Sequence, residues 1–247
     1  MNKLFEKENF VIKNPYPGKL ILLAGVDDSG KGTQARRLEI VLPAIYPKVK
    51  ILRPFPKEPT KGPIGRRIYD ILFDRDPEFT LKDGVEGKNK ITDFELQGWF
   101  IRDRIQHYQN VIIPTLASGI NVICDRGMDS TIVYGGNTIG DFKKIVALHE
   151  EMFTEAGLTL FWPDLIVVYD VTPETAMRRR KASGKECDAF EDELKTRRVT
   201  SNYRALAALY LNCRLVDAEP EGEEGQRTIF ANARRYIYPV LGINDWE

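Results

Sequence analysis

The sequence lacks an excess of either sign of charge. Among its 247 residues, Lys and Arg together number 36 and Asp and Glu together also number 36, so the formal net charge near neutral pH is zero. A chain of this kind has no overall positive field to attract polyanions such as DNA. We therefore expect no nucleic-acid partner, and any recognition of phosphate must come from local groups of basic residues.

Residues that commonly bind zinc are also scarce. The chain has three cysteines and two histidines: Cys124, Cys187, Cys213, His107 and His149. None of the cysteines has Cys-x-x-Cys spacing, so a zinc site is poorly supported. We interpret the cysteines as free thiols of a protein in a reducing cytoplasm.

Long apolar runs are absent as well. No run approaches the roughly 20 residues that a membrane-spanning helix needs, and the N-terminal 17 residues lack the apolar core of a secretory signal. We therefore expect a cytoplasmic protein with no membrane partner. Residues 1–18 are interpreted as an N-terminal extension, and residues 19–247 as a single domain.

Short apolar runs are present and are separated by long helical stretches. This rhythm is typical of a parallel sheet that is buried on both faces. We predict an α/β fold with a five-stranded parallel sheet flanked by helices. The expected strands are Leu20–Ala24, Val49–Leu52, Asn121–Cys124, Leu165–Tyr169 and Arg214–Val216.

Helical periodicity predicts several of the connecting elements. Apolar positions in Leu38–Leu42 indicate a helix that ends near Pro43, and those in Ile105–Leu116 indicate another that ends at Ser118-Gly119. Thr172, followed by proline and glutamate, is typical of a helix start.

Two charged segments, in contrast, are predicted to be loops. Residues 74–93 are rich in charge and glycine, and residues 219–226 (EPEGEEGQ) are interpreted as a solvated connection.

The stretch Gly25–Gln34 (GVDDSGKGTQ) has the spacing of a phosphate-binding loop between a strand and a helix. Backbone N–H groups and the positive end of the helix converge on an anion in such a loop. Lys31 would bridge the β- and γ-phosphates of ATP, the expected co-substrate. The candidate ATP-binding residues are Gly25, Asp28, Ser29, Gly30, Lys31, Gly32 and Thr33.

Gly32 departs from the usual pattern, because Ser or Thr normally occupies its position and contributes a hydroxyl to magnesium. Mg²⁺ can be held largely by water and by the substrate's phosphates. We therefore expect an altered Mg²⁺ site in which Thr33 and Asp125 contribute, largely through water.

Two further patterns suggest where a phosphate acceptor binds. Asp125 and Arg126 follow the third expected strand, and ligands bind at this end of the strands in open α/β sheets. Arg126 could clamp an acceptor phosphate. Phe100 and Arg104 are four residues apart on one helical face, so that a base could stack on the ring while the guanidinium bonds its edge.

A basic segment follows the fourth expected strand. It contains Arg178, Arg179 and Arg180 beside Ser183-Gly184. We interpret residues 178–192, approximately, as a lid that closes over the phosphates and contributes charge during transfer. The alternative is a solvated basic helix end.

Together these motifs resemble the thymidylate kinase family, from about Lys19 to Ala218. The similar pieces are the loop with Gly-Lys-x-Thr-Gln, Lys57-Glu58-Pro59, Phe100 with Arg104, Gln106 and His107, Asp125-Arg126 with Ser130 and Tyr134, the Arg-rich segment, and Val216-Asp217-Ala218.

The resemblance implies a P-loop nucleoside monophosphate kinase fold with a small lid, transfer of the ATP γ-phosphate to dTMP, and a homodimer. It implies that Lys31, Asp125, Arg126 and the arginines at 178, 179 and 180 have catalytic roles. The implied dTMP-binding residues are Asp28, Lys57, Phe100, Arg104, Arg126, Ser130 and Tyr134. Among these, Phe100 would stack on the base and Tyr134 would lie near the sugar.

Four departures from the family pattern leave alternatives open: Lys57 in place of Arg, Gly127 in place of Tyr, Gly135 in place of Gln, and Ala189 where Arg is frequent. A lysine lacks the planar fork of an arginine. The loop sequence GKGTQ resembles that of adenylate kinases, so AMP or another monophosphate remains an alternative acceptor. A nucleotide-binding module with impaired catalysis is the second alternative.

Overall fold

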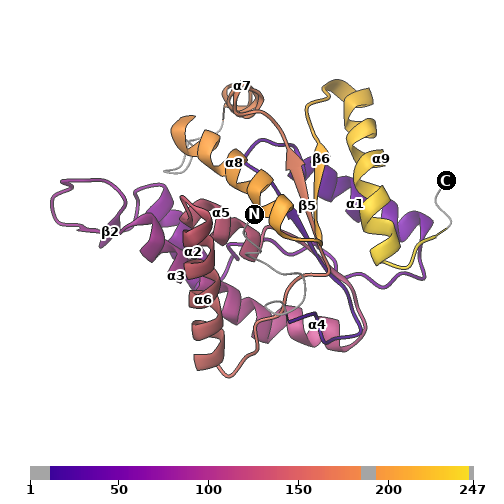
Figure 1. Ribbon diagram of the computed structural model, residues 1–247, viewed down its shortest axis with the longest axis horizontal. Coiled ribbons are helices and arrows are strands. Elements are labelled where there is room, and N and C mark those ends of the chain that lie inside the picture. The colour runs from indigo at the N-terminus through magenta and orange to yellow at the C-terminus, as the bar shows by residue number, and fades with distance from the viewer. Residues whose placement is uncertain (1–11, 185–192, 245–247) are drawn as a thin grey trace.

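A four-stranded parallel sheet forms the centre of the protein (Figure 1). The computed structural model describes residues 12–184 and 193–244. The sheet has the order β4-β1-β5-β6 and consists of β1 (Leu20–Ala24), β4 (Val122–Asp125), β5 (Leu165–Asp170) and β6 (Cys213–Asp217). All three strand pairs are parallel. The predicted α/β fold and four of its expected strands are confirmed.

The fifth expected strand, Val49–Leu52, is the exception. Ile51 forms an isolated parallel bridge with Asn121, and Lys57 forms another with Asp125. Pro54 and Pro56 lie between these two bridges and have no N–H to donate. This segment follows the edge of β4 without a continuous ladder, so the prediction of five strands was wrong by one.

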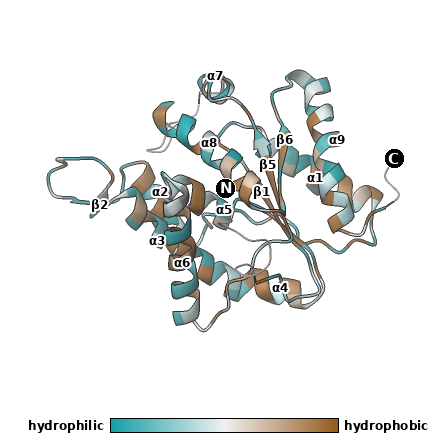
Figure 2. Ribbon diagram, in the orientation of Figure 1, coloured by the Kyte–Doolittle hydropathy of each residue, from teal (hydrophilic) through white to brown (hydrophobic). Residues whose placement is uncertain are grey.

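Helices cover both faces of the sheet (Figure 1). On one face, α1 (Lys31–Ile45) contacts β1 and β4, and α9 (Gly222–Val240) contacts β5 and β6. On the other face, α5 (Met128–Gly135) contacts β1, and α8 (Glu193–Leu209) contacts β5 and β6. The strands are the hydrophobic centre in Figure 2, and each residue of β1 is buried. Burial on both faces explains why β1 and most of β5 are continuous apolar runs, whereas the edge strand β6 includes the exposed Arg214 and Asp217.

Further helices pack outside α5. These are α3 (Asp93–His107) and α6 (Ile139–Glu155), while α2 (Pro63–Leu72) packs on α3. A π-helical turn (Tyr108–Ile112) joins α3 to α4 (Ile113–Ala117), and the passage ends at Ser118 as predicted. The first predicted helix, however, passes Pro43 and ends at Ile45.

The start of α7 (Pro173–Ser183) also agrees with the prediction. The Thr172 hydroxyl accepts a hydrogen bond from the backbone N–H of Thr175 at 3.2 Å. In the same turn, the Thr175 hydroxyl donates a hydrogen bond to the carboxylate of Glu219 at 2.7 Å. The connection after β6 is thereby attached to the start of α7.

The two predicted loops differ in outcome. Residues 74–93 form a long connection containing only the short strands β2 (Phe79–Thr80) and β3 (Asn89–Lys90), and Asp74 accepts from Thr80 and Lys82 within it. Residues 219–226 do not form a solvated loop throughout, because α9 begins at Gly222. Acidic residues in this segment fit the first turn of a helix, where the helix dipole favours negative charge.

The described part of the N-terminal extension contacts the domain. The Trp162 N–H donates to the Ile12 carbonyl at 2.9 Å, and Asn14 donates to Asp164 at 2.7 Å. Cys124 and Cys213 are buried free thiols, whereas Cys187 lies outside the described residues. Within residues 12–184 and 193–244, every helix is too short or too polar to span a bilayer.

Candidate active site

The phosphate-loop candidate begins where β1 ends and leads directly into α1. Its turn requires glycine at two positions, with a φ of 134° at Gly25 and 90° at Gly30. A Cβ at Gly25 would lie 2.8 Å from the carbonyl oxygen of Tyr169. These glycines let the chain reverse sharply, so that the N-terminal turn of α1 faces the adjacent cavity.

The cavity has a volume of about 660 Å³. It brings together residues that are distant in the sequence, including Lys31, Gly32, Thr33, Lys57, Asp125 and Arg179. The predicted loop, the edge segment, the end of β4 and the base of the predicted lid therefore border one space. This arrangement agrees with the rule that ligands bind at the carboxyl ends of parallel strands.

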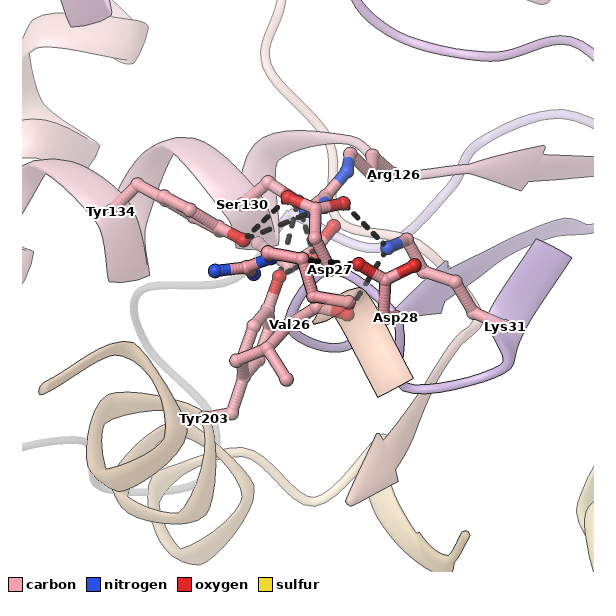
Figure 3. Close-up of polar contacts among 10 residues, drawn as sticks. Val26, Asp27, Asp28, Lys31, Arg126, Ser130, Tyr134 and Tyr203 are labelled. Carbon is pink, nitrogen blue, oxygen red and sulfur yellow. Dashed lines mark hydrogen bonds and ion pairs between the residues drawn. The ribbon is translucent and has the colours of Figure 1, made fainter. Parts of the chain in front are cut away.

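Asp27 lies at the centre of the charged groups (Figure 3). Arg126 Nη2 donates to Asp27 Oδ1 at 2.5 Å, and Lys31 Nζ donates to the same oxygen at 3.3 Å. The Tyr134 hydroxyl donates to the other carboxylate oxygen at 3.4 Å. Asp27 thus connects the phosphate loop to the Asp-Arg motif at the end of β4.

The charges of this cluster shift the pKa values of one another. Burial alone would raise the pKa of Asp27, but Arg126 and Lys31 outweigh it and hold that pKa below its ordinary value. Burial lowers the pKa of Lys31, and the nearby Arg126 lowers it further. Burial opposes the charge of Arg126, yet Asp27 keeps its pKa above the usual value. Asp27 is therefore the counter-charge for two phosphate-binding candidates.

Helix α5 places two more predicted residues beside Arg126. Arg126 Nη1 donates to Ser130 Oγ at 3.3 Å, and Arg126 Nη2 donates to the Tyr134 hydroxyl at 3.4 Å. Ser130 Oγ also lies 3.1 Å from the hydroxyl of Tyr203 on α8. Three predicted acceptor-site residues are therefore in direct contact.

Arg104, by contrast, lies in a buried network and has only 1% of its surface exposed. Its Nε donates to Glu58 at 2.8 Å, and its Nη1 contacts Thr131 at 3.0 Å and His149 at 2.6 Å. Phe100, one turn earlier, is partly buried. Neither Phe100 nor Arg104 lines the 660 Å³ cavity.

His149 is an acceptor for Arg104. Burial and the positive charge of Arg104 lower the pKa of His149 to about 3, so the ring is neutral near pH 7. The His149 Nδ1 lies 2.8 Å from the Ile145 carbonyl oxygen, which requires the proton on that nitrogen. Nε2 is then left to accept from Arg104.

Three side chains of the kinds that bind metal ions lie together beside this network, but their protonation and pairing disfavour a metal ion. Ligand atoms of Glu58, His107 and Cys124 lie within 4.8 Å of one another. Burial raises the pKa of the Cys124 thiol well above its usual value, and Glu58 is already paired with Arg104 and His107. We interpret this set as a hydrogen-bonded part of the core.

The three consecutive arginines of α7 have different surroundings. Arg178 is paired with Glu221, and Arg179 Nη2 donates to the carbonyls of Ala218 and Glu219, each at 3.0 Å. Arg180 Nε lies 3.5 Å from Asp28 Oδ2. The rest of the predicted lid, residues 185–192 including Ala189, lies outside the described residues.

Two of the departures from the family pattern, Gly127 and Gly135, have a steric explanation. A Cβ at Gly127 would lie 2.7 Å from Leu22 Cδ1. At Gly135 it would lie 2.4 Å from Cγ of Gln97, whose side chain fills that space. Both positions are therefore matched to this chain's own packing.

Asp27 and Asp129 are the principal site residues that sequence reasoning missed. Asp27 was overlooked because the neighbouring Asp28 was chosen from the same Asp-Asp pair, although the pair itself was a visible signal. Asp129 is fully buried between Ser130 and Tyr203, which lie 3.1 and 3.3 Å from its Oδ2. Its pairing with α8 had no signal in the sequence.

Asp129 makes the stability of this site pH-dependent. Burial raises its pKa to about 6, although Arg126 and Arg104 act in the opposite direction. Because the folded-state pKa is higher than the unfolded value, stability is lost as pH rises from about 4 to above 6. Asp129→Asn removes this loss and keeps a hydrogen-bond acceptor.

We expect the free energy of unfolding of Asp129→Asn, relative to wild type, to increase by up to about 3 kcal/mol between about pH 4 and about pH 7. Urea unfolding at several pH values measures this difference, with the exposed Asp83→Asn as the control. A difference that does not change with pH would show that Asp129 ionises normally.

Comparisons with known proteins agree with this geometry. The thymidylate kinase family model matches residues 23–229. A thymidylate kinase from Caldicellulosiruptor saccharolyticus is 31% identical over 91% of this chain and 98% of its own length. A probable thymidylate kinase from Pyrococcus abyssi is 30% identical over 92% of this chain and 99% of its own length.

The same fold occurs in a solved structure. The crystal structure of thymidylate kinase from Ehrlichia chaffeensis superposes with a TM-score of 0.58 at 20% identity, covering 89% of this chain and 98% of that one. The fold, the site and the extent of the family match lead to one conclusion: the chain belongs to the thymidylate kinase family.

Proposed function

We propose that this kinase transfers the γ-phosphoryl group of ATP to dTMP and forms dTDP. The observation that carries the proposal is the cluster in which Asp27 joins Lys31, on the phosphate loop, to Arg126, at the end of β4. A phosphoryl-transfer site must align a donor and an acceptor between fixed positive charges. Family membership supports the identities of both substrates.

The donor phosphates would bind at the loop from Gly25 to Thr33. Backbone N–H groups at the start of α1 would surround the β-phosphate, and Lys31 would bridge to the γ-phosphate. Lys31 Nζ now contacts the Val26 carbonyl at 3.2 Å and Asp27 at 3.3 Å, so its position is fixed before ATP arrives. Such preorganisation favours the charge that develops during transfer.

The acceptor would bind beside Arg126 and Lys57. Arg126 would clamp the monophosphate, Ser130 would support its guanidinium, and Tyr134 would lie near the sugar. Lys57 is exposed and lines the cavity as a point charge. Phe100 and Arg104 remain the candidates for the base. Within residues 12–184 and 193–244, the contacts of Arg104 leave one Nη2 N–H for a base oxygen.

The residues present fit an Mg²⁺ ion. Asp125 Oδ1 is buried at the end of β4 and has no hydrogen-bond partner among the described residues. Asp125 and Thr33 line the same cavity as Lys31. Asp125 and Thr33 would hold hydrated Mg²⁺, which neutralises phosphate charge when bound.

The enzyme's assembly and location are also proposals. We propose a homodimer on the basis of the family and a cytoplasmic location, where ATP and dTMP are available. The lid arginines would contribute charge from α7.

The decisive experiment is a panel of nucleoside monophosphates, each incubated with ATP and magnesium while ADP formation is recorded. We expect turnover to be fastest with dTMP and to fall at least about 100-fold in Lys31→Ala, because the variant lacks the charge between the phosphates. The exposed Lys48→Ala is the matched control. Fastest turnover with AMP would identify AMP as the acceptor in place of dTMP. Binding of ATP and dTMP without ADP formation would indicate a nucleotide-binding module with impaired catalysis.

Gly32 provides a second test, which concerns the metal. A Cβ at this position would meet nothing within 4 Å, so a serine fits without displacement. Gly32→Ser restores the hydroxyl that usually contacts magnesium in such loops. We therefore expect half-maximal activity at a roughly two- to fivefold lower Mg²⁺ concentration, because one weak ligand contributes at most about 1 kcal/mol here. Gly32→Ala is the control, and an equal shift in both variants would exclude a role for the hydroxyl.

A further inference from the structure

Two consecutive acidic residues of the phosphate loop hold arginines from different parts of the chain. Asp27 binds Arg126, which follows β4, and Asp28 is paired with Arg180 of α7. The Asp28 and Arg180 side chains are each only 8% exposed. Asp28 also has a φ of 58°, in the left-handed region that non-glycine residues seldom occupy. The loop therefore presents this carboxylate from a constrained backbone position.

The two neighbouring arginines have other partners. The Arg178 side chain is 58% exposed and is paired with Glu221 on the surface. Arg179 is directed to backbone carbonyls, with Nη2 donating to Ala218 and Glu219 at 3.0 Å and Nη1 to Ser29 at 3.5 Å. Arg179 thus clamps the loop after β6 to the phosphate loop. Among the three, Arg180 is the one whose carboxylate partner belongs to the phosphate loop.

A carboxylate in a phosphate-binding loop would weaken nucleotide binding if its charge were not balanced. Arg180 supplies that balance, and its guanidinium is held beside the loop. Burying the pair also carries a desolvation penalty, which makes it a poor source of stability. What the pair provides is a fixed place for one guanidinium against the loop that holds the donor phosphates.

Building on the proposed function, we propose that Asp28 is a positioning residue that holds Arg180 at the phosphate loop, and that Arg180 is the arginine of α7 that contributes positive charge to phosphoryl transfer. An arginine at the transferring group accelerates such reactions by about 10³- to 10⁵-fold in other phosphoryl-transfer enzymes. The γ-phosphoryl group leaves the β-phosphate oxygen and bonds to the acceptor phosphate oxygen, and Arg180 itself is unchanged.

The first test compares Arg180→Met, Arg180→Lys and Asp28→Asn with Arg227→Met, at saturating ATP and acceptor. We expect kcat to fall at least about 100-fold in Arg180→Met and about 10-fold in Asp28→Asn, with both KM values within about threefold of wild type. Arg180→Lys retains the charge and should be intermediate. Arg227 is an exposed arginine of α9 that is paired with Glu223, so Arg227→Met should stay within about twofold of wild type. Thermal unfolding reports whether each variant folds.

Chemical rescue separates positioning from a structural role. Guanidinium, added at a concentration that leaves wild type folded and active, should restore kcat to Arg180→Gly in a saturable way. The same addition should fail in Arg180→Gly combined with Asp28→Asn, because the carboxylate that binds the guanidinium is gone.

Three outcomes would overturn the proposal: Arg180→Met with nearly wild-type kcat, a higher kcat in Asp28→Asn, or rescue that does not depend on Asp28. These outcomes differ from failure of the proposed function itself, in which wild type forms no ADP with any monophosphate.

Discussion

The carboxylate of Asp27 is the contact on which the rest of the site depends. It lies between Arg126 at 2.5 Å and Lys31 at 3.3 Å, two cations that would otherwise repel each other in a buried place. Their attraction to Asp27 fixes the end of β4 against the phosphate loop after β1. Because β1 and β4 are neighbours in the sheet, this charge arrangement builds on a backbone register that is already set. The sheet brings the groups close, and the ion pairs fix their directions.

Much of the fold could be predicted because buried parallel strands are visible as short apolar runs. Leu20–Ala24 was predicted with the bounds that the structure has. Val49–Leu52 is also largely apolar, but Pro54 and Pro56 interrupt its pairing along the edge of β4. The start of α9 was missed because EGEEGQ is as polar as a loop, although acidic residues also suit a helix N-terminus. Local composition therefore identified strands better than it separated loops from polar helix starts.

The candidate site was predictable where a motif is local, and less so where partners come from distant segments. The loop with Lys31 and the pair Asp125-Arg126 are short motifs whose location follows from the strands before them. Helical spacing placed Phe100 and Arg104 on one face, but spacing carries no information about depth. Arg104 is buried because Glu58, Thr131 and His149 come from three other segments to meet it. Only the three-dimensional structure shows that Arg104 already makes hydrogen bonds with three side chains of the protein, which occupy most of its N–H groups.

Pairing with arginines explains how a loop with two acidic residues can bind an anion. Asp27 and Asp28 are each paired with an arginine, so the loop's negative charge is neutralised before a nucleotide arrives. A phosphate that binds Arg126 or Lys31 must therefore compete with Asp27, which lowers the net gain in affinity. In return, the guanidinium and ammonium groups need little reorganisation when the phosphates bind. An enzyme gains more in rate from charges fixed where the transition state needs them than from stronger binding of its substrate, so this balance favours turnover over affinity.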